Sequence, residues 1–144
     1  MDIDPKTAEM KIRRFVAIDD CGNIINPMIV TGQIHGGLAM GIAPAMYEEL
    51  IYDDDGNILN GTFMDYLLPT SVETPNWETG HTITPSPHHP LGAKGVAESP
   101  TVGAPPAVAN AVVDALSHLG VTHVDIPVTP FKVWKILKEK GVIS

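Results

Sequence analysis

Apolar and polar positions change their spacing along the chain, and these changes divide it into predicted elements. Residues 11–18 are rich in β-branched and aromatic side chains and precede turn-forming residues at 19–23, which predicts a strand. Residues 4–9 look like a hairpin loop before that strand, so residues 1–3 are left to supply its partner. A second hairpin is predicted at the turn 53–57.

A first long helix is predicted to follow these strands. Asn26 followed by Pro27 is typical of a helix start, and helical character continues to about Leu50. Four glycines fall within it: Gly32, Gly36, Gly37 and Gly41. Because glycine costs roughly 1 kcal/mol in a helix interior, these positions indicate close approach of the backbone to another helix or to a ligand.

Two further helices are predicted in the second half of the chain. One begins near the prolines at 105–106 and ends at Gly120, and the other begins at Thr129-Pro130 and ends at Gly141. Their predicted inward faces hold Val108, Val112, Ala115, Leu116 and Leu119, and then Val133, Trp134 and Leu137. Together the elements predict an α+β fold with a small mixed sheet and about three helices, and residues 1–144 as a single partial domain.

Composition and charge narrow the class of protein. With 44% hydrophobic and 18% charged residues, the chain resembles a soluble globular protein. No apolar run reaches the roughly 18–20 residues of a transmembrane helix, and the acidic start lacks signal-peptide order, so we expect a cytoplasmic protein. The net charge of −8 disfavours nucleic acid as a partner. A single cysteine, Cys21, leaves any iron–sulfur cluster to another chain.

Common catalytic motifs are absent, and two other motifs remain as candidates. Phosphate-binding and dinucleotide glycine loops, a serine elbow and a zinc His-Glu-x-x-His are not found, and the adjacent side chains of His88 and His89 diverge, so no metal site is predicted. Residues 32–37 place the Gln33 amide, which has donors and an acceptor, among glycines, an arrangement that suits a polar heterocycle, a phosphate or simple packing.

The second motif, residues 92–100, is Gly-Ala-Lys-Gly-Val-Ala-Glu-Ser-Pro, a small-residue run that ends in an acid. It is predicted to be a loop from which Glu98 projects, held by Pro100. A carboxylate in a partly desolvated pocket can act as a general base. Taken alone, the same pattern also fits a solvated loop glutamate.

Four segments together resemble the xanthine dehydrogenase/aldehyde oxidase family of molybdenum hydroxylases. They are residues 19–27, 32–37, 65–70 and 92–100, and their order and spacing are closest to large subunits of the aerobic carbon monoxide dehydrogenase type. The resemblance implies that Glu98 is the active-site base next to molybdenum. It also implies cofactor-binding roles for Gln33, Lys94, Gly95, Val96 and Ala97. Ala97 stands where the family usually has glycine, which would strain a position of positive φ.

The resemblance further implies a C-terminal segment of a large subunit that oxidises an aldehyde, an N-heterocycle or carbon monoxide. The implied cofactor is molybdopterin, with the cytosine dinucleotide form as one option, and iron–sulfur clusters and FAD would lie on partner chains. Expected partners are the rest of the large subunit, the iron–sulfur and flavin subunits and a second copy. Alone, the chain is expected to be inactive. The alternatives are a non-catalytic assembly fragment and a small pterin- or nucleotide-binding module.

Overall fold

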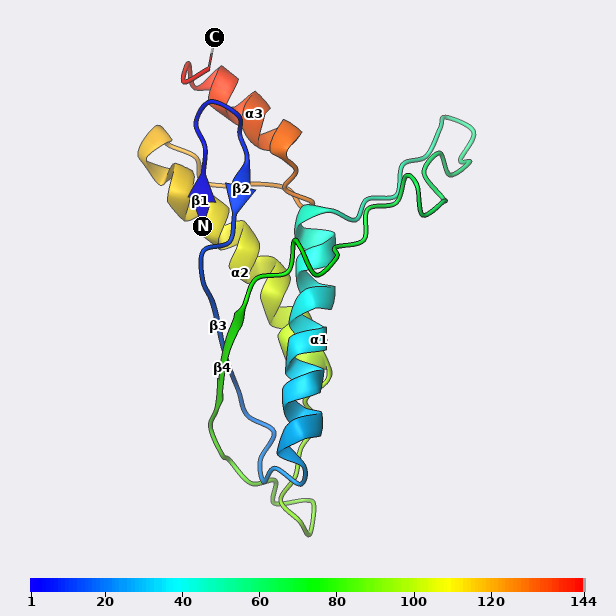
Figure 1. Ribbon diagram of the computed structural model, residues 1–144, viewed down its shortest axis with the longest axis vertical. Coiled ribbons are helices and arrows are strands. Elements are labelled where there is room, and N and C mark those ends of the chain that lie inside the picture. Colours follow the sequence, from blue (N-terminus) through cyan, green and yellow to red (C-terminus); the bar gives the residue numbers. More distant parts are fainter. Residues whose placement is uncertain (144) are drawn as a thin grey trace.

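The computed structural model describes residues 1–143, in which three α-helices are combined with short strands (Figure 1). In chain order the elements are β1 (Asp2–Ile3), β2 (Met10–Lys11), β3 (Phe15–Asp19), α1 (Pro27–Met46), β4 (Trp77–His81), α2 (Glu98–Leu116), the 3-10 helix η1 (Ser117–Leu119) and α3 (Pro130–Glu139). This confirms the α+β class and the three predicted helices. Within the described residues, none of the helices combines the length and apolar character that crossing a membrane requires.

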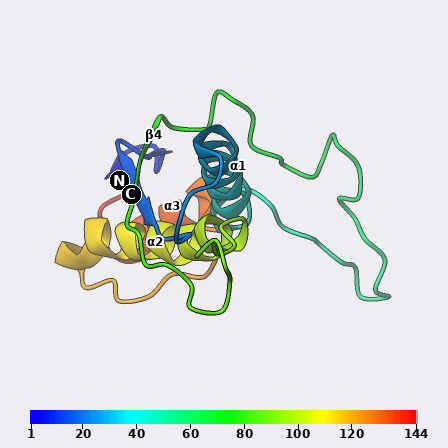
Figure 2. The same cartoon turned by 90° about the horizontal axis from the view of Figure 1, so that it is seen from below.

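The strands form two separate pairs in place of one mixed sheet. β1 and β2 pair in antiparallel fashion around the predicted loop, in which the Asp4 carboxylate accepts the backbone N–H of Lys6 at 2.7 Å. β3 and β4 pair in parallel, with Phe15 opposite Trp77 and Asp19 opposite His81. The Phe15 and Trp77 rings meet edge to face, with 5.4 Å between their centroids. The paired strands β3 and β4 lie beside the two long helices, α1 and α2 (Figures 1 and 2).

The predicted caps of α1 and α3 are confirmed. The side-chain oxygen of Asn26 accepts the backbone N–H of Met28 at 3.1 Å, and that of Thr129 accepts the N–H of Lys132 at 3.3 Å. α1 ends at Met46, four residues before the predicted end.

The predicted start of α2 is wrong. This helix begins at Glu98, so Pro105 and Pro106 lie in its interior and Pro100 in its first turn. A first-turn proline is compatible with a helix because the N–H there has no partner within the helix. The interior prolines disfavour a helix locally, and here packing against α1 outweighs that preference.

Two glycines of α1 allow it to touch α2. A Cβ added at Gly37 would lie 2.5 Å from Cγ of Pro100, and one at Gly41 would lie 2.7 Å from Cβ of Ala104. No side chain larger than hydrogen fits these sites without displacing α2. Added Cβ atoms at Gly32 and Gly36 would meet nothing within 4 Å. The four glycines therefore divide into a pair for helix packing and a pair that faces open space.

The core lies in two adjoining clusters that α2 connects. One contains Ile34, Leu38, Ile42, Ala45, Met46, Ala104 and Val108. The other contains Ala8, Val112, Leu116, Val121, Val124, Val128, Val133 and Leu137. The predicted inward residues of α2 and α3 are thus confirmed at Val108, Val112, Leu116, Val133 and Leu137, whereas Ala115, Leu119 and Trp134 are only partly buried.

Asp20, which directly follows β3, ties the segment before α2 to both parallel strands. Its carboxylate accepts from Lys94 Nζ at 2.8 Å, from the backbone N–H of Gly22 at 2.9 Å and of Thr84 at 3.1 Å, and from Thr82 Oγ1 at 3.2 Å. The hydrogen bond from Lys94, followed by those from Thr84 and Gly22, holds the pKa of the Asp20 carboxyl well below its ordinary value. One charged group therefore fixes a strand end and the approach to α2.

The helix contact predicts opposite effects for two glycine substitutions. Gly41→Ala should lower the free energy of unfolding by about 1–3 kcal/mol, because its methyl group collides with Ala104 and Thr101. Gly32→Ala, in the same helix but facing open space, should raise it by up to about 1 kcal/mol. Urea unfolding followed by circular dichroism measures both. Equal effects of the two substitutions would show that the helices do not depend on this contact.

The Asp20 network predicts a pH-dependent loss of stability. Since the pKa of Asp20 is lower in the folded than in the unfolded chain, its contribution is complete above about pH 4 and declines as the pH falls further. The difference in unfolding free energy between the wild type and Asp20→Asn should therefore be largest near pH 7 and shrink toward pH 2. Asp54→Asn, at an exposed carboxylate, is the matched control and should show a smaller difference throughout. A constant wild-type-to-Asp20→Asn difference would contradict the assignment.

Candidate functional site

A groove of about 380 Å³ runs between residues 32–40 of α1 and the start of α2. Its walls are formed by Gly32, Gln33, Gly36, Gly37, Met40, Ala97, Glu98, Thr101 and Val102. Gln33 and Glu98 are 65 positions apart (98 − 33) and line the same groove. Both side chains are exposed to solvent.

Glu98 reaches the groove as the first residue of α2, and the prediction that it projects from a loop is wrong. The hydroxyl of the next residue, Ser99, donates to the Asp19 carboxylate and to the Val96 carbonyl, the latter at 3.2 Å. The helix start is thus attached to the end of β3, directly beside Asp20. Asp19 and Asp20 together hold both ends of the segment 94–99, which fixes where Glu98 emerges.

The alanine before the acid is accommodated without strain. Ala97 has φ −62° and ψ −39°, in the right-handed helical region that any residue adopts. The family's usual glycine at this place is therefore not required by the backbone conformation of this chain.

The other predicted cofactor-binding residues lie at different distances from the groove. Lys94 directs its ammonium group to Asp20, Gly95 is exposed, and Val96 packs partly against the first core cluster. Of the predicted site residues, the structure brings Gln33, Ala97 and Glu98 together in the groove. The roles of all six in binding or catalysis remain predictions.

Sequence reasoning missed three residues of the groove: Met40, Thr101 and Val102. A signal for Met40 was present, because it follows Gly32 and Gly36 at helical spacing on one face of α1. Thr101 and Val102 were placed outside any helix by the incorrect start of α2. Their one-turn spacing from Glu98 therefore carried no signal.

The residue types that line the groove suit the recognition of a polar heterocycle. Gly32 and Gly36 leave the backbone of α1 open to close approach, and the Gln33 amide supplies hydrogen-bond donors and an acceptor. Glu98 adds a carboxylate on the opposite wall. Within residues 1–143, no group of three or more His, Cys, Asp and Glu side chains could hold a metal ion.

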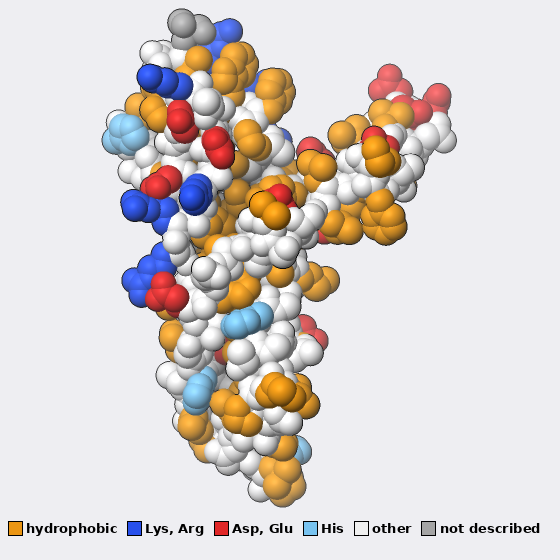
Figure 3. Space-filling view, in the orientation of Figure 1, with side chains coloured by type: hydrophobic (Ala, Val, Ile, Leu, Met, Phe, Trp, Pro, Cys, Tyr) orange, Lys and Arg blue, Asp and Glu red, His pale blue; other side chains and the backbone are white. Residues whose placement is uncertain are grey.

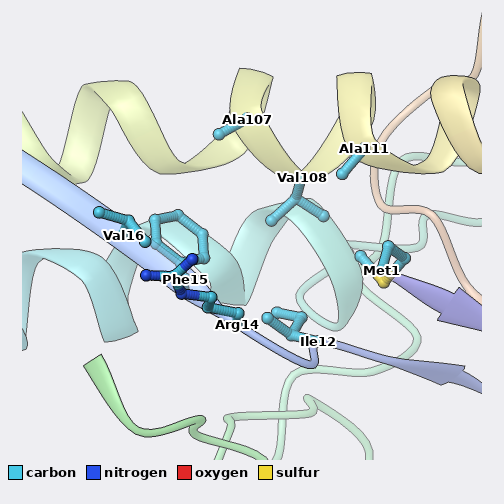
Figure 4. Close-up of a pocket in the computed structure, with 8 residues that line it drawn as sticks. All are labelled: Met1, Ile12, Arg14, Phe15, Val16, Ala107, Val108 and Ala111. Atoms are coloured by element: carbon cyan, nitrogen blue, oxygen red, sulfur yellow. The ribbon is translucent and has the colours of Figure 1, made fainter. Parts of the chain in front are cut away.

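A separate hollow of about 160 Å³ lies between α2 and the chain from Ile12 to Val16 (Figure 4). Small side chains of α2, Ala107 and Ala111, leave this space open. Its charged side chain, Arg14, already forms a two-pronged ion pair with Glu78, with both N–O distances 2.6 Å. The hollow holds none of the predicted site residues and offers little polar chemistry.

Comparisons with known proteins find relatives along nearly the whole chain. Residues 1–75 match the sequence family described as a molybdopterin cofactor-binding domain. The chain is 63% identical over 142 residues to the carbon monoxide dehydrogenase large chain of Hydrogenophaga pseudoflava, covering 99% of this chain and 18% of that one. It is 43% identical over 144 residues to the nicotine 6-hydroxylase large subunit of Paenarthrobacter nicotinovorans, covering 100% of this chain and 17% of the relative.

Solved structures show the same fold. Reconstituted carbon monoxide dehydrogenase from Oligotropha carboxidovorans superimposes with a TM-score of 0.93 and 54% identity, over 97% of this chain and 17% of that chain. Quinoline 2-oxidoreductase from Pseudomonas putida 86 gives a TM-score of 0.91 and 46% identity, over 95% and 17%. The chain thus spans less than a fifth of the length of these relatives.

The family match covers 75 of 144 residues, and the similarity to relatives extends along nearly the whole chain. The chain therefore belongs to the molybdopterin cofactor-binding domain family, as its resemblance to xanthine dehydrogenases and aldehyde oxidases predicts.

Proposed function

We propose that this chain is the C-terminal molybdopterin-binding segment of the large subunit of a molybdenum-dependent hydroxylase or dehydrogenase, with Glu98 as its active-site base. The observation that carries the proposal is the position of Gln33 and Glu98 on opposite walls of one groove, which the glycine-mediated contact of α1 with α2 creates. The relatives' names add support, since they include a carbon monoxide dehydrogenase and a nicotine hydroxylase.

In this proposal the residues that line or support the groove have separate roles. The bound cofactor supplies the redox chemistry. The Gln33 amide orients the cofactor by hydrogen bonds, and the open backbone at Gly32 and Gly36 lets it approach α1. The Glu98 carboxylate takes a proton from a hydroxyl group at the α2 side of the groove, which makes that oxygen a better nucleophile. Asp19 and Asp20 keep the carboxylate in place through Ser99 and Lys94.

Exposure of the groove explains why we expect the isolated chain to be inactive. Two or three hydrogen bonds in water contribute about 0.5–1.5 kcal/mol each, against an association cost of at least roughly 4 kcal/mol. Further polypeptide must therefore cover the groove for the cofactor to stay bound. The proposal assigns this cover to the rest of the large subunit, and assigns the iron–sulfur clusters and FAD to partner chains. The cofactor in this proposal is molybdopterin, with the cytosine dinucleotide form as one option.

The substrate class in the proposal is an aldehyde, an N-heterocycle or carbon monoxide. Two relatives whose names indicate different substrates are each at least 43% identical to this chain. That similarity supports a role for the segment in the common proton transfer, with substrate choice made by other parts of the enzyme. The competing proposal, a non-catalytic fragment that only binds partners, gains support from the exposed apolar side chains at 48–75.

Replacing the proposed base should separate chemistry from cofactor binding. The test enzyme is a chimeric Hydrogenophaga pseudoflava carbon monoxide dehydrogenase in which this chain replaces the matched segment of the large chain. Glu98→Gln in this chimera should lower the rate of carbon monoxide oxidation about 10²–10⁴-fold, because the shape remains and the base is lost. Molybdenum content, measured by metal analysis, should not change. Near-normal turnover would place the base elsewhere, and an inactive but fully loaded unmodified chimera would favour the non-catalytic alternative.

Replacing Gln33, the proposed cofactor contact, should reduce cofactor binding more than the rate of the reaction. Gln33→Leu in the chimera should lower molybdenum content, because a hydrogen-bonding amide that faces the cofactor is lost. The rate per bound molybdenum should fall much less than in Glu98→Gln. Val16→Leu, at an exposed position outside the groove, is the control and should change neither quantity. Full molybdenum content in Gln33→Leu would remove Gln33 from the binding site.

A further inference from the structure

Residues 48–75, which we name the arm, leave the end of α1, project away from the body of the protein, and return beside Met46 and Tyr47 at residues 72–75 (Figures 1 and 2). None of the buried apolar side chains among residues 1–143 belongs to the arm, whereas ten large apolar side chains within it are at least 48% exposed. The most exposed are Phe63 at 91%, Met64 at 88% and Val72 at 87%. Large apolar side chains exposed together on one segment often mark a site of protein association.

The arm holds a defined shape despite lacking a core. The Asp53 carboxylate accepts the backbone N–H of Asn57 at 2.8 Å and so closes the turn between Tyr52 and Ile58, which form an antiparallel bridge. The Asn60 amide spans the same hairpin, accepting the N–H of Ile51 at 2.8 Å. A surface ordered by its own hydrogen bonds loses less conformational freedom on binding. The arm therefore already has an ordered conformation before it binds a partner.

Charge distinguishes the arm from the rest of the chain. The arm contains seven acidic residues and no Lys or Arg: Glu48, Glu49, Asp53, Asp54, Asp55, Asp65 and Glu73. Since the whole chain has 17 acidic and nine basic residues, the remainder has ten and nine and is nearly neutral. In the described residues one arm carboxylate has a basic partner, Glu49, which lies 3.6 Å from Lys132. Figure 3 shows acidic groups gathered at the tip beside apolar side chains.

The arm has a counterpart in a much longer protein. The superposition on the Oligotropha carboxidovorans enzyme covers 97% of 144 residues, about 140, and so leaves about four unmatched. The arm has 28 residues (75 − 48 + 1), so most of it is matched within a chain of which this one covers 17%. The arm's shape thus also occurs in a protein that contains a large amount of additional polypeptide.

We propose that the arm docks this domain onto the remaining part of a large subunit, in an apolar groove bordered by Lys and Arg side chains. The proposal rests on the proposed function. Apolar side chains such as Phe63 and Met64 would fill the groove and supply most of the affinity. The surrounding carboxylates would select the basic border and speed the encounter.

Paired substitutions in the chimeric carbon monoxide dehydrogenase test this docking. Phe63→Asp should lower the yield of assembled, molybdenum-containing chimera roughly tenfold or more, since it places a charge in the apolar groove. Phe63→Leu, which stays apolar, should assemble normally. Asp54→Lys with Asp55→Lys should also lower the yield, whereas Asp54→Asn with Asp55→Asn should lower it less. In the isolated chain none of these should shift the unfolding midpoint, because the side chains are exposed and form no part of the core.

The chimera yield decides the outcome. Equal yields for Phe63→Asp and Phe63→Leu would overturn the proposal, as would an unmodified chimera that does not accumulate. If the isolated chain instead sediments as a dimer that Phe63→Asp dissociates, while chimera yields are unaffected, the arm binds a second copy and the proposal is wrong. An arm-dependent chimera that still oxidises carbon monoxide after Glu98→Gln would overturn the assigned base and leave the docking intact.

Discussion

The contact between α1 and α2 at Gly37 and Gly41 is the constraint on which the candidate site depends. Because neither glycine has a side chain, α2 approaches α1 closely enough for Pro100 and Ala104 to rest on its backbone. The groove adjoins this contact, since Gly37 lines it together with the open glycines Gly32 and Gly36. A wider separation would leave Gln33 and Glu98 on unrelated surfaces. The same geometry thus provides both the core and the opening beside it.

A hydrogen bond and an ion pair determine where α2 begins. The neighbouring carboxylates at the end of β3 take different partners, Ser99 for Asp19 and Lys94 for Asp20. Packing alone would permit α2 to slide or fray at its first turn, where backbone N–H groups have no partner within the helix. Fixing both ends of a six-residue segment removes that freedom. Precision at Glu98 thus comes from charged groups that do not line the groove.

Much of the fold could be predicted from local sequence signals. Local signals correctly predicted the caps at Asn26 and Thr129, the loop between β1 and β2, and the apolar spacing of the last two helices. Each of these features is determined by nearby residues. The start of α2 could not be predicted this way. Its prolines oppose a helix locally, and the contact that outweighs them lies about 60 positions away on α1. The division of the strands into two pairs likewise depends on long-range partners.

In the candidate site, the acid and the amide were easier to predict from the sequence than the residues around them. Gln33 and Glu98 stood out through their small neighbours and through family resemblance, and the structure brings them to one groove. Lys94 belonged to the same motif, yet its ammonium group faces Asp20. Adjacent residues in a motif can serve different structural ends, and only the side-chain directions distinguish them.

The position of the arm has a consequence for how this domain can change. The arm lies within the stretch of chain that joins Gly41 to Ala104, which is 63 positions long (104 − 41). Removing all 28 arm residues would shorten that loop to 35, and the entropy of closing it would change by only about 0.5 kcal/mol. Folding of the helix pair is therefore almost indifferent to the length of this insertion. The arm can therefore change in length and sequence during evolution with little effect on how the two helices pack.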